Sequence, residues 1–158
     1  MLEAYTDADW GSNLDDRRSV SEIMIMIGGV PVAFKSKYRR TVALSSAEAE
    51  YMTLSLYTQD VLWTRAMLKD LSHEQVGAKQ VWEDNQGAIA LASNAGYNAW
   101  TKHVDIRHHF IRKNVARDIV RLRRTDDQLA DLLTKALGTK RLRFLVEASS
   151  IRPKPAQH

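Results

Sequence analysis

The stretch that decides the fold is E-I-M-I-M-I-G-G-V-P-V-A-F-K-S-K, residues 22 to 37. After its leading glutamate the first half is continuously apolar, which is typical of a strand buried on both faces. A Gly-Gly pair then supplies a tight turn, and the second half returns as another strand. The stretch therefore predicts a β-hairpin.

The segments on either side extend the hairpin into an α/β domain. Residues 2 to 10 alternate like a strand, so the first three strands form an antiparallel meander. A Ser cap at 45 or 46 begins a helix that runs to about residue 71, with Glu48 in capping-box spacing from Ser45. The later expected elements are a strand at 79 to 83, a helix at 84 to 92, a helix at 101 to 116, a strand at 118 to 123 and a helix at 126 to 137.

Length and composition fit one folded domain with a basic end. The chain has 158 residues, of which 44% are hydrophobic and 27% charged, as is ordinary for a globular protein. We expect the domain over residues 1 to 137. From Gly138 we expect a basic tail over 138 to 158 that is either a second contact region or loosely ordered.

Composition also narrows the function classes. The net charge of +4 permits a polyanionic partner without requiring one. The absence of cysteine excludes disulfides and thiolate metal sites and is compatible with a reducing compartment. No stretch approaches the ~20 apolar residues of a membrane span, and the first residues lack the features of a signal peptide. We therefore expect a cytoplasmic protein with no membrane partner.

Two glutamates begin the long helix in S-S-A-E-A-E-Y, residues 45 to 51. At 100° per residue, Glu50 falls on the same face as Leu54 and Val61, whereas Glu48 lies about 160° away. A carboxylate on a core-facing stripe is costly unless something positive meets it. Glu50 is therefore expected to meet a metal ion. The ordinary alternatives are a buried ion pair with an arginine and a position at the margin of the stripe near the helix end.

Three aspartates have positions that are unusual for isolated carboxylates. Asp7 lies within a strand, where Asp is depleted; Asp84 follows the fourth expected strand, and Asp131 lies on the last helix. Each has an ordinary explanation, as a strand end, a helix N-cap and a salt bridge to Lys135 respectively. Together with Glu50, however, they suit a pair of hard divalent cations better than they suit one another.

Six segments of the chain follow one another in a specific order and spacing. They are Y-T-D-A-D-W, D-D-R-R-S-V-S, V-A-L-S-S-A-E-A-E-Y, E-D-N-Q-G-A-I-A-L, T-K-H-V-D-I-R-H-H-F-I-R and D-Q-L-A-D-L-L-T-K-A-L. Over about residues 3 to 137 they resemble the ribonuclease H domain of copia-type retrotransposon Pol polyproteins. The resemblance implies a ribonuclease H-like α/β fold, a mixed five-stranded sheet flanked by helices. It also implies an enzyme that cuts the RNA strand of RNA–DNA hybrids during reverse transcription.

The resemblance assigns two Mg²⁺ ions, replaceable by Mn²⁺, to Asp7, Glu50, Asp84 and Asp131 as catalytic and metal-binding residues. Asp7 would bridge both ions. Glu50 and Asp84 would hold the ion at the leaving 3′ oxygen, and Asp131 the ion that activates the attacking water. Asp9 shares a strand face with Asp7, and the residues alone do not separate the two.

An RNA–DNA hybrid must be held by its backbone and 2′-hydroxyls, because its sequence must not matter. The candidate phosphate contacts are Lys35, Lys37, Arg39, Arg40, Lys102, Arg107, Arg112 and Lys113. The resemblance implies a reverse transcriptase, joined covalently or associated, as the partner, and a virus-like particle as the location if the element is active.

The sequence departs from the family pattern at several positions. Glu22 stands where Gly is usual, Glu83 where Cys is common, Gly87 where Ser is common, and residues 98 to 100 where a basic or His-containing triplet is common. No histidine loop precedes Asp131, so we expect slow product release. The histidines of the helix at 101 to 116 are expected on its surface; they are His103, His108 and His109.

Three alternatives remain open. The first is a catalytically weak or retired ribonuclease H-fold module that binds nucleic acid or serves as a structural part of a reverse transcriptase. The second is an integrase-like nuclease, which would need its glutamate on a late helix, where this chain has Asp131. The third is a basic protein–protein module, for which no specific motif is present.

Overall fold

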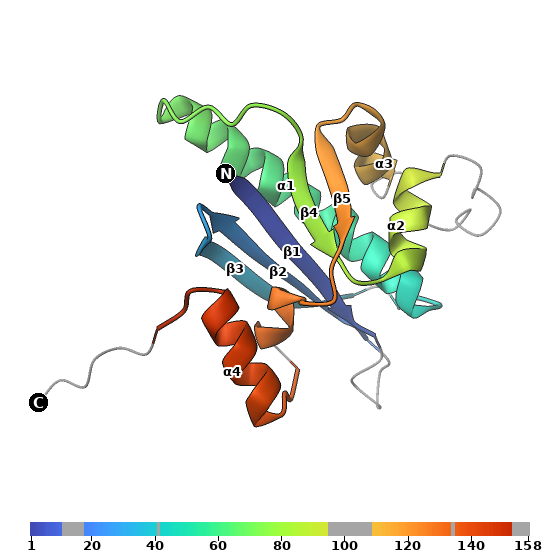
Figure 1. Cartoon of the computed structure of the whole chain (residues 1–158). Helices are drawn as coiled ribbons and strands as arrows, with labels where there is room; N and C mark the ends of the chain where they lie inside the picture. Colours follow the sequence, from blue (N-terminus) through green and yellow to red (C-terminus); the bar gives the residue numbers. More distant parts are fainter. Residues whose placement is uncertain (11–17, 41, 95–108, 134, 153–158) are drawn as a thin grey trace, which may run out of the picture.

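The structure is a computed structural model that describes residues 1–10, 18–40, 42–94, 109–133 and 135–152. The described elements are β1 (Leu2–Asp9), β2 (Val20–Ile27), β3 (Val30–Tyr38), α1 (Ser46–Asp70), β4 (Lys79–Glu83), α2 (Gln86–Ser93), α3 (His109–Ala116), β5 (Val120–Arg124), the 3₁₀ helix η2 (Leu129–Leu133) and α4 (Thr139–Ala148). Five strands form one sheet in the order β3-β2-β1-β4-β5 (Figure 1). Because β1 pairs antiparallel with β2 and parallel with β4, the sheet is mixed, and the expected ribonuclease H-like fold is confirmed.

Strand β2 is buried on both faces, as its apolar run predicts. Ile23 and Ile25 belong to the larger core cluster, which the sheet forms with α1, α2 and α3. Met24 and Met26 point to the other face and pack against η2 and α4. The sheet therefore separates two layers, with the long helix α1 behind it and α4 in front in the view of Figure 1.

The capping box fixes the rotation of α1. Ser45 Oγ accepts a hydrogen bond from the Glu48 backbone N–H at 3.2 Å, and Glu48 Oε2 accepts one from the Leu44 N–H at 3.0 Å. Glu48 is thereby held at the exposed helix start, while Glu50 is only 5% exposed. The expected difference between the two glutamates is confirmed.

The chain after β5 differs from the expected helix at 126 to 137. The described residues there form only the short η2, because the side chain of Gln128 turns inward and is 1% exposed. Its Nε2 donates to the Thr6 carbonyl at 2.7 Å, and its Oε1 accepts from the Ala130 N–H at 3.4 Å. These bonds hold the start of η2 against β1 instead of continuing a helix.

The segment from Gly138 is more ordered than a loose tail. Residues Thr139–Ala148 form α4, whose Leu145 is fully buried against β2 and η2. In the sequence of this segment, the basic residues draw attention away from Leu145, the buried apolar residue of α4. Of the helix expected at 101 to 116, residues 109–116 are described and helical. Among the described helices, none combines the length and apolarity needed to cross a membrane.

Candidate metal centre

Three carboxylates converge where the parallel strands β1 and β4 end. Asp7 comes from β1, Glu50 from the start of α1, and Asp84 from the residue directly after β4. One carboxylate oxygen of each lies within 4.8 Å of the others. In an octahedral Mg²⁺ site, opposite oxygens lie about 4.2 Å apart. Only a small contraction would therefore bring these three side chains to ligand positions around one ion.

Close packing of two helices helps to bring these acids together. A Cβ on Gly87 of α2 would lie 2.9 Å from the Cβ of Ala47 in α1, so the two helices approach closely only because Gly87 has no side chain. The contact joins the first turn of α2 to the first turn of α1. It thus places Asp84, two residues before α2, beside the helix that carries Glu50.

Burial makes the cluster difficult to ionise without a cation. Asp7 is 1% exposed, and burial raises its pKa to about 6, although the neighbouring Lys135 opposes the rise. Burial, reinforced by the carboxylates of Glu83 and Asp7, raises the pKa of Glu50 well above its usual range. Glu50 Oε2 has no hydrogen-bond partner among the described residues. Buried oxygen donors with an unpartnered atom fit a hard divalent cation.

The structure removes two of the ordinary explanations. Asn85, and not Asp84, caps α2, since its side chain accepts from the Ala88 N–H at 3.1 Å. Asp7 lies inside β1, which continues to Asp9. Asp9 is half-buried and lies outside the three-residue cluster found among the described residues, so the structure separates it from Asp7.

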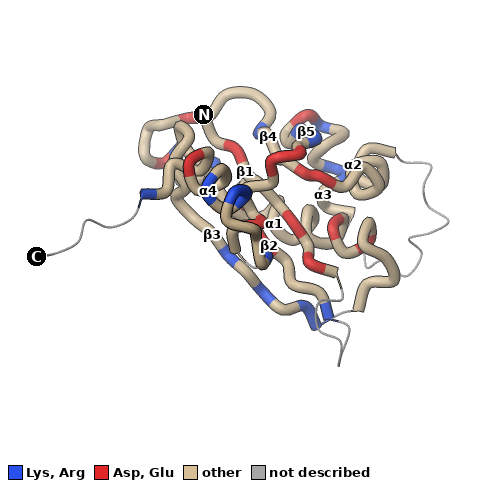
Figure 2. The backbone as a smooth tube through the Cα atoms, turned by 60° about the horizontal axis from the view of Figure 1, so that its bottom comes forward, with Lys and Arg blue, Asp and Glu red and all other residues tan. Residues whose placement is uncertain are grey.

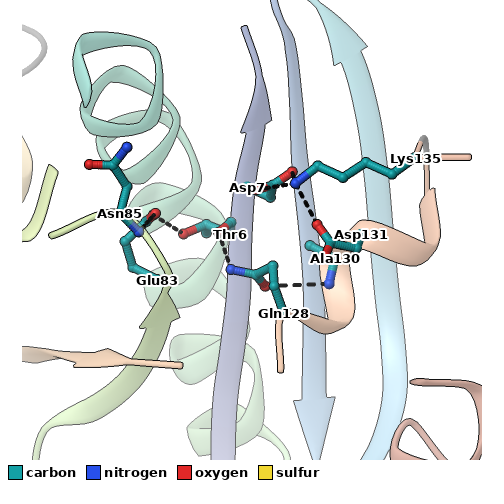
Figure 3. A network of polar contacts seen from close by, with 8 residues as sticks. All are labelled: Thr6, Asp7, Glu83, Asn85, Gln128, Ala130, Asp131 and Lys135. Carbon is teal, nitrogen blue, oxygen red and sulfur yellow. Dashed lines mark hydrogen bonds and ion pairs between the residues drawn. The ribbon is translucent and has the colours of Figure 1, made fainter. Parts of the chain in front are cut away.

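The fourth acid, Asp131, contacts a lysine. Lys135 Nζ lies 2.6 Å from Asp131 Oδ1 and 2.9 Å from Asp7 Oδ2 (Figure 3). Burial acts to lower the pKa of Lys135, but the two carboxylates outweigh it and hold the pKa above its usual range. The salt bridge expected between Asp131 and Lys135 is present, and Lys135 also pairs with Asp7 of the three-carboxylate cluster.

A second buried glutamate, Glu83, ties the strand ends together. It is fully buried and accepts hydrogen bonds from Thr6 Oγ1 at 3.2 Å and from the Asn85 N–H at 3.0 Å. The Thr6 carbonyl accepts from Gln128, so one polar network joins β1, β4 and η2 (Figure 3). Burial raises the pKa of Glu83 well above its usual range.

Glu22 is the third buried glutamate of this region. It pairs directly with Asp7 across β1 and β2 and is fully buried. Burial first, and then the Asp7 carboxylate, raises its pKa to about 8. In the sequence, Glu22 and Glu83 stand out only as departures from the family pattern. The signal that was available is a carboxylate inside an otherwise apolar strand, where burial is expected.

The candidate phosphate contacts differ in how they are used within the fold. Lys35 pairs with Asp60 at 2.7 Å. Arg39 donates to the Ala49 carbonyl at 3.0 Å, and Arg112 donates to the Leu91 carbonyl at 2.7 Å. These three therefore have internal roles. Among the described candidates, Lys37, Arg40 and Lys113 are exposed, and so is Lys35 despite its ion pair.

Basic residues follow strand β3 and its end, where Figure 2 shows a row of blue segments along one edge of the sheet. Lys102 and Arg107 lie outside the described residues, as do His103 and His108. His109 is exposed at the start of α3, as expected.

Comparison with known proteins places this fold and site in a family. No protein-family model matches the chain. The chain is 33% identical over 149 residues to the retrovirus-related Pol polyprotein from transposon TNT 1-94 of Nicotiana tabacum, covering 93% of this chain and 11% of that protein. It is 36% identical over 139 residues to the Pol polyprotein from transposon RE1 of Arabidopsis thaliana, covering 87% of this chain and 10% of that protein. The corresponding protein from transposon RE2 is 35% identical, again over 87% of this chain. The chain thus spans about a tenth of the length of these relatives and belongs to the Pol polyproteins of copia-type retrotransposons.

Proposed function

We propose that the chain is a divalent-metal-dependent ribonuclease H that hydrolyses the RNA strand of RNA–DNA hybrids. The observation that carries the proposal is the convergence of Asp7, Glu50 and Asp84 from three elements on a ribonuclease H-like fold. Membership in the copia-type Pol family supports it, because reverse transcription of an RNA genome produces such hybrids.

Two overlapping sets of acidic side chains would bind the two ions. Asp7, Glu50 and Asp84 would hold one ion, and Asp7 with Asp131 would hold the second. When bound, such ions lower the pKa of a water and neutralise charge on the scissile phosphate and its leaving oxygen. The protein would hold these acids in position in advance of ion binding. The hydrogen bonds of Glu83 connect the ends of β1 and β4, which carry Asp7 and Asp84.

The substrate contacts are proposed for the exposed basic residues Lys35, Lys37, Arg40 and Lys113, together with the half-buried Arg39 and Arg112. Phosphate contacts of this kind position a duplex without reading its sequence, as a nuclease for any hybrid requires. Lys102 and Arg107 stay in the proposal from sequence. We further propose that the domain acts joined to, or beside, a reverse transcriptase, a partner supported by its Pol polyprotein relatives.

The test is a cleavage assay on three labelled substrates: RNA–DNA hybrid, RNA duplex and single-stranded RNA. We expect cleavage of the hybrid's RNA strand only, with Mg²⁺ or Mn²⁺ but not Ca²⁺, which tolerates looser coordination geometry. Glu50→Gln should abolish cleavage, whereas the matched helix-start control Glu48→Gln should retain it. Equal cleavage of RNA duplex, or an active Glu50→Gln, would contradict the proposal. Hybrid binding without cleavage would favour the retired module instead.

A further inference from the structure

The ammonium of Lys135 occupies the space between two acids that belong to different parts of the fold. It lies 2.9 Å from Asp7 Oδ2 on β1 and 2.6 Å from Asp131 Oδ1 beside it (Figure 3). Its Nζ also donates to Asp7 Oδ1 at 3.0 Å. Asp7 is at the same time one of the three clustered carboxylates. A cation that is part of the chain thus sits directly beside the proposed metal site.

This arrangement differs from an ordinary helix-surface ion pair. An exposed pair four residues apart typically contributes well under 1 kcal/mol and exchanges freely with water. Here the Asp7 side chain is 1% exposed and that of Asp131 is 13% exposed. For comparison, Lys69 and Glu74 pair at 3.5 Å with both side chains more than 60% exposed. The Lys135 side chain is itself 33% exposed, so this is a partly buried contact whose carboxylates are largely shielded from water.

Glu22 provides an independent observation beside the same position. It faces Asp7 in the antiparallel register, and side chains opposed in this way lie on the same face of a sheet. It is fully buried, yet among the described residues neither of its carboxylate oxygens has a hydrogen-bond partner. The charged groups that act on it are Asp7, Lys135, Asp131 and Asp9. A buried carboxylate without a partner is costly when it is ionised, so an ionised Glu22 would accept a cation that came within reach.

We propose that Lys135 is a tethered cation that fills the position between Asp7 and Asp131, and that a second divalent ion binds there only after the ammonium moves to Glu22. The inference rests on the proposed function for the identity of the ions. Without the second ion, the ammonium leaves Asp7 and Asp131 with a net charge of −1. With the ion bound, one ammonium and one divalent ion balance the three carboxylates of Asp7, Asp131 and Glu22. Lys135 is a positioning residue in this scheme, and Glu22 is its alternative acceptor.

The scheme makes metal binding sequential. The first ion meets Asp7, Glu50 and Asp84, of which Asp7 is the member that Lys135 contacts in the described structure. The second ion must displace the Lys135 ammonium, which is tethered and so present at high effective concentration. This competition lowers the apparent affinity of the site for the second ion. Removing the ammonium should strengthen the second binding step, and removing the Glu22 charge should weaken it.

The experiment is a Mn²⁺ titration of the metal-free protein without nucleic acid, followed by calorimetry and by electron paramagnetic resonance of the unbound ion. We expect two binding steps in the parent. Lys135→Met should tighten the second step at least about tenfold, and Glu22→Gln should weaken it about threefold or more, because each removes one charge next to the ion. Lys69→Met, which removes a lysine from an exposed ion pair, should change neither step.

Lys135→Gln is the second variant, because it keeps hydrogen bonding to the carboxylates without the positive charge and so covers failure of Lys135→Met to fold. An unchanged second step in the folded lysine variants would overturn this inference while leaving the first site intact. Loss of all binding in the parent would instead overturn the proposed function, and the inference with it.

Discussion

Replacing Glu22 by glutamine should stabilise the metal-free protein at neutral pH but not at acidic pH. The carboxylate is fully buried, and burial together with Asp7 raises its pKa from 4.5 to about 8. Between these two values the folded state holds a proton that the unfolded state releases, so stability falls as pH rises through this window. Glutamine resembles the protonated carboxyl but has no proton to release. The substitution therefore removes the part of the pH-dependent stability loss that Glu22 causes.

The magnitude follows from the width of that window. Between the ordinary pKa of 4.5 and pH 7, each pH unit lowers the free energy of unfolding by about 1.4 kcal/mol. The total loss relative to acidic pH is therefore at most about 3 kcal/mol. Relaxation of the surrounding side chains lowers this, and we expect a gain of about 1 to 3 kcal/mol. For a domain of 158 residues that is a rise in melting temperature of roughly 3 to 9 °C.

The assay is thermal and urea unfolding in a metal chelator at pH 4.5, 6 and 7.5. The control is Glu147→Gln on the exposed side of α4, which should be neutral throughout. The gain for Glu22→Gln should be near zero at pH 4.5 and largest at pH 7.5. An equal effect at all three values, or destabilisation at pH 7.5, would show that Glu22 is held ionised by a partner and would refute the reasoning.

Two further predictions concern the far face of the sheet and the substrate grip. Leu145→Ala should cost about 2 to 4 kcal/mol in urea unfolding, because it opens a cavity between α4, η2 and β2, whereas the exposed Leu142→Ala should cost much less; equal small losses would mean that α4 is not part of the cooperative unit. Lys37→Ala should flatten the plot of log hybrid affinity against log salt by ~0.7–0.9, the effect of one lost phosphate contact, and Lys35→Ala should do so less because Asp60 already pairs with Lys35; identical slopes for all three proteins would place the hybrid elsewhere.

The local features of this fold could be predicted because neighbours in sequence determine them. The apolar run of β2, the Gly-Gly turn and the capping box of α1 each act over a few residues. Gly28 and Gly29, for example, both have positive φ, at 59° and 79°, as a tight hairpin turn requires. The helical period likewise predicts that Glu50 is the more buried of the two glutamates, and Glu48 is only half-buried. These features were confirmed.

The long-range polar contacts could not be predicted in the same way. Lys135 and Asp7 are 128 residues apart, and the sequence pairs Lys135 only with Asp131 in the same turn. The helix expected at 126 to 137 would include Gln128 as an ordinary helical residue. Its bond to the Thr6 carbonyl, 122 residues away, forms only once the sheet is assembled. Leu145 has the same difficulty, since the apolar partners that bury it are on β2.

The position of β1 in the centre of the sheet has a consequence for assembly during synthesis. Strand β1 can pair with β2 as soon as β2 has been synthesised, but its other edge must wait for β4 at Lys79–Glu83. Such non-local pairing is slow, because the entropy cost of closing a long loop comes before the strand pairing that offsets it. Translation also delivers Asp7, Glu50 and Asp84 before Lys135, so a nascent chain carries its three clustered acids before it carries the lysine that neutralises one of them.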